Sequence, residues 1–214
     1  MHIVILTGGE YEESFLQSFF VKETVDYVIA VDGGLDYSRR LGITVDEAVG
    51  DFDTVSLETL KAYEKENGKF EKFSPYKDYS DTHLAILKAI EKKPSSITIL
   101  CGLGGRMDHA LATIFNLVLP LKEHIPCSIQ NERNKITMTD HKLICKKSKQ
   151  HGKYVSLLPF SPKVEGITLK GFLYPLEKAT ICQGESIGIS NELIEDEGEI
   201  TLEKGILIVV EAKD

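Results

Sequence analysis

The pattern of apolar residues changes near Pro126, and this change constrains the fold more than any other feature of the sequence. Before it, short β-rich apolar runs alternate with segments whose apolar residues recur at helical spacing; the runs include His2–Thr7 (HIVILT), Tyr27–Val31 and Ile97–Cys101. Continuous runs of this kind are typical of strands covered on both faces of a parallel sheet. We therefore predict a right-handed, parallel, Rossmann-like α/β domain over residues 1–127.

Residues 128–214 show a different pattern, with short β runs and no segment of helical spacing. The runs are Ile136–Thr139, Lys142–Cys145, Tyr154–Leu158, Gly166–Lys170, Ile187–Ser190, Glu199–Glu203 and Ile206–Glu211. Glycine turns separate several of them, and Glu203-Lys204-Gly205 is typical of a tight hairpin. This pattern predicts a second, all-β domain, a β-sandwich or an open barrel.

Local signals predict several element boundaries. Gly42 is placed to cap a helix that ends near Arg40, and Ser56 is a suitable N-cap for the helix that follows it. We expect a loop over Phe70–Ser80 and an amphipathic helix that begins at Asp81. The strongly apolar segment Ala110–Leu121 predicts a single helix that lies against the core.

Composition excludes several classes of protein. A formal net charge of −8 and an isoelectric point near 5.3 argue against nucleic acid as a partner, because such binders normally carry a basic stripe. No apolar run approaches the roughly 18 residues of a membrane span, and the N-terminal residues lack the basic region of a signal peptide. The four cysteines are scattered and are expected to be reduced, which favours a cytoplasmic protein.

Two aspartates flank Phe52 in the segment Val49–Ser56 (VGDFDTVS). If this segment is extended, Asp51 and Asp53 point the same way, because side chains alternate along a strand. Two carboxylates on one face need a cation, and Mg²⁺ that carries a phosphate is the simplest choice. An acidic surface turn is the alternative interpretation.

Other loops are expected to meet these aspartates. Ligands of parallel α/β sheets bind beyond the carboxyl ends of the strands. The loops that fall there are Thr7–Gly9, Asp32–Gly34, Gly50–Asp53 and Gly102–His109, with Lys77–Asp81 before the fourth helix. We expect them to bring together Asp32, Asp51, Asp53, Asp78, Asp81, Asp108, Lys77 and Arg106.

Each of these groups also has a purely structural interpretation. Asp32-Gly33-Gly34 alone could be a turn, Asp81 could complement a helix dipole, and Asp108 could be an N-cap. His109 is expected to be a core or capping residue, and His83 to be solvated.

The glycine loop Gly102–Gly105 lacks the GxGxxG spacing of a dinucleotide site. Arg106, between three loop glycines and an aspartate, suits a bidentate contact with phosphate.

In this order, the motifs resemble those of the thiamine pyrophosphokinase family. That family has DGG after a strand, then GDFDS, K-D-x-T-D and G-G-R-x-D-H. The present chain has Asp32–Gly34, GDFDT, KDYSD and GLGGRMDH. Its segments YVSLLPF, GITLKGFLYPL and GISNE resemble the thiamine-binding β-domain of the family, so the resemblance spans nearly the whole chain.

The resemblance implies transfer of a pyrophosphoryl group from ATP to thiamine, giving thiamine diphosphate and AMP. Asp51, Asp53 and Asp81 would hold Mg²⁺, and Asp53 or Asp81 could accept the thiamine proton. Catalytic roles are implied for Asp53, Asp81 and Arg106, and thiamine contacts for Ser190 and Asn191. The residues implied in nucleotide binding are Asp32, Gly33, Lys77, Gly104, Arg106 and Asp108.

The family also implies a homodimer in which each β-domain completes the site of the other subunit. Thr54 and Ser80 depart from the family motifs but keep a hydroxyl group. Thr113 stands where the family commonly has asparagine, which leaves one nucleotide or loop contact open. With no tryptophan in the chain, any ring stacked on thiamine must be Phe or Tyr.

Three other functions compete with this interpretation. GDFDTV matches the DxDx[TV] signature of haloacid-dehalogenase-type phosphatases, but the strand before it is short and interrupted by Gly50. A nucleotide-sensing module would not need so many aspartates at one edge. A pyrophosphokinase that acts on another alcohol, such as a pterin, would keep the mechanism and change the substrate.

Overall fold

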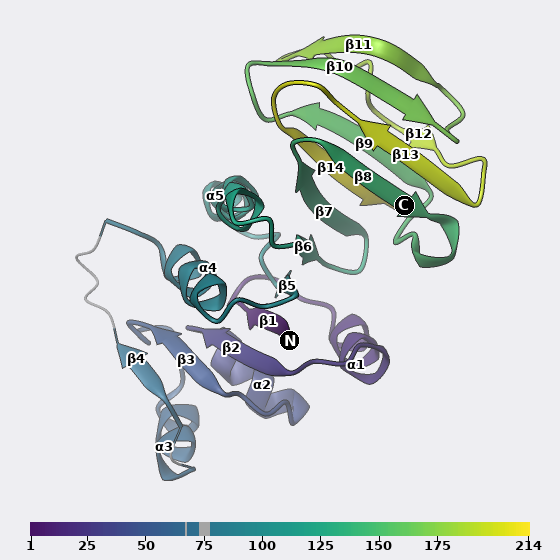
Figure 1. The fold of residues 1–214 in the computed structure, drawn as a ribbon. Coiled ribbons are helices and arrows are strands. Elements are labelled where there is room, and N and C mark those ends of the chain that lie inside the picture. The colour runs from purple at the N-terminus through teal and green to yellow at the C-terminus, as the bar shows by residue number, and fades with distance from the viewer. Residues whose placement is uncertain (67, 73–77) are drawn as a thin grey trace. The chain divides into compact units, whose positions relative to one another are not determined.

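The computed structural model describes residues 1–66, 68–72 and 78–214 (Figure 1). They fall into two compact units, Met1–Glu132 and Arg133–Asp214. Lys77, implied in nucleotide binding, lies outside the described residues. Among those described, no helix has both the length and the apolar character needed to cross a membrane.

A parallel sheet forms the centre of the first unit. Its strand order is β6-β5-β1-β2-β3-β4, and every neighbouring pair is parallel. The strands are β1 (His2–Leu6), β2 (Tyr27–Val31), β3 (Glu47–Gly50), β4 (Phe70–Lys72), β5 (Ser96–Leu100) and β6 (Cys127–Gln130). The chain order reverses between β1 and β5. At such a reversal the loops that follow the two strands diverge and leave room for a ligand.

Helices cover both faces of this sheet (Figure 1). The helices are α1 (Glu13–Lys22), α2 (Gly34–Leu41), α3 (Leu57–Lys65), α4 (Asp81–Glu91), α5 (Met107–Asn116) and α6 (Val118–Lys122). On one face, α1, α2 and α3 pack through Leu16, Leu35 and Tyr63 onto strand residues such as Leu6 and Ala30. On the opposite face lies α4, and its Lys88 Nζ is 3.2 Å from Glu47 Oε1 on β3.

Several predicted boundaries are confirmed. Gly42 ends α2 in the left-handed conformation, with φ 66°. Ser56 caps α3, and its hydroxyl oxygen accepts a hydrogen bond from the Thr59 N–H. Helix α4 begins at Asp81 as expected.

Two predictions in this unit are wrong. The expected loop Phe70–Ser80 begins with β4, which pairs with β3 at the edge of the sheet. The expected single helix over Ala110–Leu121 is two helices, α5 and α6, joined at Leu117. Helix α5 is apolar but is not fully buried in the core, because Met107, Leu111 and Phe115 are 64%, 48% and 53% exposed.

The second unit contains two antiparallel sheets around one apolar core. The first has the order β12 (Asn191–Glu192), β9 (Tyr154–Pro159), β14 (Leu207–Ala212), β7 (Asn134–Thr139). The second has the order β11 (Leu176–Cys182), β10 (Lys163–Lys170), β13 (Glu197–Thr201), β8 (Lys142–Lys146), and a 3₁₀ turn follows at Lys147–Lys149. Both sheets contribute to the core, for example Leu157 and Val209 from the first and Ile167 and Ile200 from the second. The predicted succession of an α/β segment and an all-β segment is therefore confirmed.

Two local predictions for this unit are also wrong. Ile187–Ser190 forms turns, because only Asn191 and Glu192 pair with β9. Glu203-Lys204-Gly205 is not a hairpin, since β13 pairs within one sheet and β14 within the other. The chain crosses between the sheets at this point, and a local turn signal contains no information on which sheet the next strand joins.

Candidate functional site

A cleft of about 730 Å³ lies at the carboxyl edge of the parallel sheet, where the strand order reverses. The loops after β1, β2, β3 and β5 line it, together with the first turns of α4 and α5. Of the residues predicted to converge, those that line the cleft are Asp32, Gly33, Asp51, Asp78, Asp81, Gly104 and Arg106. Asp53 and Asp108 are not among the described lining residues, and their roles remain predictions.

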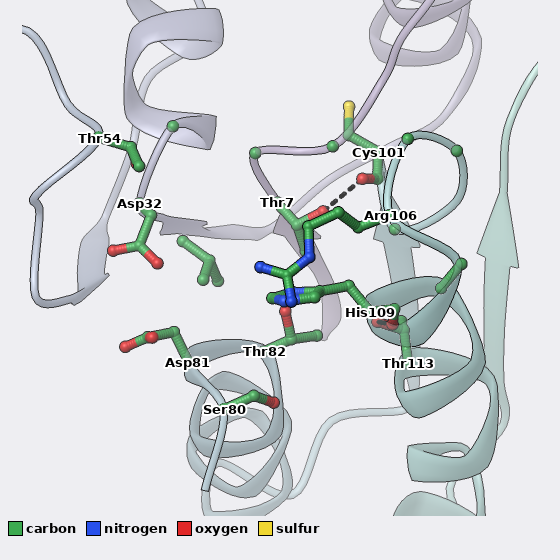
Figure 2. Close-up of a pocket in the computed structure, with 18 of the residues that line it drawn as sticks. Thr7, Asp32, Thr54, Ser80, Asp81, Thr82, Cys101, Arg106, His109 and Thr113 are labelled. Carbon is green, nitrogen blue, oxygen red and sulfur yellow. Dashed lines mark hydrogen bonds between the residues drawn. The ribbon is translucent and has the colours of Figure 1, made fainter. Parts of the chain in front are cut away.

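The loops after β1 and β5, which both line the cleft, contact each other. The hydroxyl of Thr7 donates to the carbonyl oxygen of Cys101 at 2.6 Å, the bond drawn in Figure 2. A Cβ atom on Gly9 would lie 2.2 Å from the same oxygen, so only glycine allows this approach. Burial raises the pKa of the Cys101 thiol to about 12, so the thiol stays neutral near pH 7.

The Asp51–Asp53 segment forms a turn, and the expected extended conformation is wrong. Strand β3 ends at Gly50, and Phe52 adopts a left-handed conformation with φ 61° while its ring is buried. The turn is closed by a hydrogen bond of 3.2 Å from the Asp53 N–H to Asp51 Oδ1. Asp51 lines the cleft, whereas Asp53 is exposed and is not among the described lining residues.

Asp32 helps to hold this turn. Its Oδ1 accepts a hydrogen bond of 3.2 Å from the Phe52 N–H. A Cβ atom on Gly50 would lie 1.9 Å from the same oxygen, and Gly50 has φ 151°. Asp32 thus has a structural role in addition to its place in the cleft lining.

A second carboxylate, Asp36 on α2, anchors the other end of the turn. It accepts hydrogen bonds from the Ser56 N–H at 3.0 Å, the Ser56 hydroxyl at 2.7 Å and the Thr59 hydroxyl at 2.5 Å. Partial burial disfavours the charged form, but the hydrogen bonds from Thr59 and Ser56 outweigh it and lower the pKa of Asp36. The start of α3, and with it the end of the Asp51–Asp53 turn, is therefore held by α2.

We expect Asp36→Asn to lower the free energy of unfolding by about 1–2 kcal/mol at pH 7, because an amide replaces a charged acceptor at a partly exposed site. A lowered folded-state pKa contributes stability that is present above the unfolded value, about 3.9, and lost as pH falls through the folded value. The difference between variant and parent should therefore shrink below about pH 4. Urea unfolding at pH 7 and at pH 3 measures both effects.

Glu58→Gln is the matched control, since the Arg39–Glu58 pair also joins α2 to α3 but Glu58 is 84% exposed. A stability change within about 0.5 kcal/mol is expected for it. A loss for Asp36→Asn that does not depend on pH would show that its charge plays no part.

The cleft has an acidic side and a basic side. Figure 2 shows Asp32 and Asp81 on one side, and Arg106, His109 and Thr113 on the other. Ser80 caps α4 by accepting a hydrogen bond from the His83 N–H at 3.3 Å, which places Asp81 in the first turn of that helix. Within the described residues, no group of three or more His, Cys, Asp or Glu side chains is arranged to hold a metal ion.

Arg106 forms a two-point contact with Asp108. Its Nη2 lies 2.6 Å from Asp108 Oδ2, and its Nε lies 3.2 Å from Asp108 Oδ1. The hydrogen bonds of this pair lower the pKa of Asp108. Both side chains are largely exposed, 72% and 65%. Asp108, which is not among the described lining residues, thus orients the guanidinium of Arg106, which lines the cleft.

The two histidines differ from expectation. His109 is exposed and lines the cleft, so the prediction of a core residue is wrong. The ring of His83 is stacked on that of Tyr79, with centroids 4.5 Å apart, and is not simply solvated. Thr113 is buried beside the cleft, and its hydroxyl donates to the His109 carbonyl oxygen at 2.9 Å.

Comparisons with known proteins match both units. A family model described as thiamin pyrophosphokinase, catalytic domain, matches residues 21–129, and one described as thiamin pyrophosphokinase, vitamin B1 binding domain, matches residues 140–207. A thiamine pyrophosphokinase from Bacillus subtilis is 35% identical over 186 residues, 87% of each chain. The chain belongs to the thiamine pyrophosphokinase family.

Solved structures of the family have the same fold. The crystal structure of thiamine pyrophosphokinase from Bacillus subtilis is similar with a TM-score of 0.89 at 32% identity, covering 100% of both chains. The yeast enzyme, at 15% identity, matches with a TM-score of 0.79 over 99% of this chain and 86% of its own. At that identity the likeness concerns the fold alone.

Ser190 and Asn191, the predicted thiamine contacts, have different environments in the structure. Ser190 is exposed, has φ 58°, and its N–H donates to the Ser156 hydroxyl at 3.0 Å. Asn191 is only 6% exposed, and its amide bonds to both the N–H and the carbonyl oxygen of Tyr174 at 3.0 and 2.8 Å. Asn191 also accepts from the Glu192 N–H, so its amide holds two chain segments together.

Sequence reasoning missed lining residues such as Glu10 and Tyr37. Glu10 lies in the loop after β1, and Tyr37 lies one turn into α2. Glu10 packs under the glycine loop, where a Cβ atom on Gly104 would lie 2.7 Å from its Oε2. Both lie a few residues after a predicted strand end, which is a usable signal, but neither belongs to a family motif.

Proposed function

We propose that this chain transfers the pyrophosphoryl group of ATP to the hydroxyethyl oxygen of thiamine, giving thiamine diphosphate and AMP. The observation that carries the proposal is the match to both the catalytic and the vitamin B1 binding models of one family. The cleft supports it, because carboxylates face a guanidinium across a space suited to a metal-bound polyphosphate. The reversal of strand order beside it supports a Rossmann-like nucleotide-binding role for residues 1–127.

The acidic side of the cleft fits Mg²⁺. Asp51 and Asp81, with Asp32 beside them, offer oxygen ligands only. Mg²⁺ keeps several waters and uses one or two carboxylates plus substrate phosphates, so a preassembled protein cage is not required. When bound, the ion neutralises charge on the triphosphate and on the leaving group. Asp53 is a further candidate ligand. A change in the conformation of the Asp51–Asp53 turn would bring its carboxylate to the ion.

The protein residues orient the reactants and move one proton. The thiamine hydroxyl oxygen forms a bond to the β-phosphorus of ATP, and the bond from that phosphorus to the α,β-bridging oxygen breaks, so AMP leaves. Arg106 binds phosphate oxygens, and the glycine loop allows close approach of the backbone. Asp81 is favoured over Asp53 as acceptor of the hydroxyl proton, because Asp81 lines the cleft.

Residues 128–214 would bind thiamine, with Ser190 as the exposed contact and Asn191 in support. We further propose a cytoplasmic homodimer in which the β-domain of one subunit completes the α/β site of the other. Light scattering of the purified protein tests the dimer. Mixing of an Asp81→Asn subunit with a Ser190→Ala subunit should restore part of the activity if sites are shared.

One assay separates the proposed function from its rivals. With Mg²⁺, ATP and thiamine, we expect AMP and thiamine diphosphate in equal amounts. AMP formed only with a pterin alcohol would assign another acceptor. Phosphate release from phosphoesters that Asp51→Asn abolishes would assign a phosphatase. Neither rival is supported by the comparisons.

A further inference from the structure

Tyr79 places an aromatic ring at the cleft, and the ring of His83 packs against one of its faces. It lines the cleft and is 54% exposed. Its ring is stacked on that of His83, with centroids 4.5 Å apart and planes inclined by 22°. The Ser80 cap fixes the start of α4 between the two residues.

Two tyrosines line the described part of the cleft, and only Tyr79 has a ring available for a ligand. The hydroxyl of Tyr37 donates to the Gly8 carbonyl oxygen at 3.2 Å, and its ring packs on Tyr11 with centroids 4.3 Å apart. Tyr11 is held in turn by Arg40, whose Nη1 lies 3.0 Å from the Tyr11 hydroxyl. Tyr37 is therefore part of the wall of the cleft.

The surroundings of Tyr79 indicate the kind of ring that would bind. Asp78 and Asp81 lie on either side of it in the chain, and both line the cleft. A π-face beside carboxylates favours a planar ring with positive charge or amino hydrogens. The two proposed substrates both qualify: thiamine has an aminopyrimidine and a cationic thiazolium, and ATP has adenine.

We propose that Tyr79, supported by His83, is a stacking site for the planar heteroaromatic ring of a substrate. The inference rests on the proposed function, which supplies the two candidate ligands. Stacking on an aromatic side chain contributes enough for its loss to weaken binding by at least about fivefold. The stacking site recognises the shape of the ring, and other residues of the cleft bind the phosphates.

Calorimetric titration of the full-length protein with thiamine and, separately, with ATP and Mg²⁺ shows which of the two substrates stacks its ring on Tyr79. We expect Tyr79→Leu to weaken binding of one ligand at least about fivefold and to change the other less than twofold. Tyr79→Phe should regain most of the lost affinity, and His83→Ala should weaken the same ligand to a smaller extent. The melting temperature checks that Tyr79→Leu is folded.

The outcomes separate this inference from the proposed function. If the parent forms thiamine diphosphate and folded Tyr79→Leu binds both ligands as the parent does, the stacking site is overturned and the function stands. If the parent binds ATP without acting on thiamine, and Tyr79→Leu weakens ATP, the function fails and the stacking site stands. Equal losses for Tyr79→Phe and Tyr79→Leu would also overturn the stacking site.

Discussion

Asp81→Asn is expected to lower kcat by about 10²- to 10³-fold, the usual cost of removing one preorganised electrostatic group from an active site. Asp81 lines the acidic side of the cleft and is held in the first turn of α4. Its proposed roles, as a Mg²⁺ ligand and as acceptor of the hydroxyl proton, both need the negative charge and not the shape of the side chain. Asparagine keeps the shape, and steady-state kinetics with ATP and thiamine measure the loss.

The competing explanation makes a different prediction. If Asp81 only complements the dipole of α4, Asp81→Asn should cost roughly 0.3–1 kcal/mol of stability and leave kcat nearly unchanged. Because Ser80 is the cap, the helix start should survive in either case. Asp53→Asn, on the Asp51–Asp53 turn but outside the described lining, is the informative comparison. A loss as large as that of Asp81→Asn would place Asp53 in the metal site after all.

The convergence of the site could be predicted because of how parallel sheets are built. Strands that run the same way end at the same edge, so any loop that follows such a strand is brought there. The sequence marks these strand ends clearly, with apolar runs that stop at glycine or aspartate. Asp32, Asp51 and Arg106 can therefore be placed at the cleft from their positions after predicted strands.

The direction of each side chain could not be predicted in the same way. An extended Asp51–Asp53 segment is the simplest expectation from the sequence, yet Phe52 is buried and has a left-handed backbone, so the segment forms a turn. That conformation depends on Asp32, which comes from another strand and bonds to the Phe52 N–H. Likewise, the amide of Asn191 is engaged by Tyr174, a partner that only the folded second unit brings near.

Arg106→Leu is expected to lower kcat/KM for ATP by about 10²-fold or more. Hydrogen bonds to charged groups contribute about 1.5–3 kcal/mol each, and arginine can place two of them on one phosphate. Arg106→Lys keeps the charge but not the planar fork, so it should recover only part of the loss. Initial rates over a range of ATP concentrations at saturating thiamine measure both variants.

Asp108→Asn distinguishes a phosphate-binding arginine from an exposed ion pair. Asp108 holds Nε and Nη2 of Arg106, so its loss should misplace the guanidinium and raise KM for ATP while kcat falls less. An ion pair without a catalytic role predicts nearly normal kinetics for both Arg106→Leu and Asp108→Asn, because exposed pairs contribute little. Since Arg106 faces Asp32 and Asp81 across the cleft, its removal would leave the carboxylate side without the opposing charge that positions a polyphosphate between them. If the cleft holds a polyphosphate between its carboxylates and the guanidinium of Arg106, we expect a large effect of Arg106→Leu and a smaller effect of Asp108→Asn.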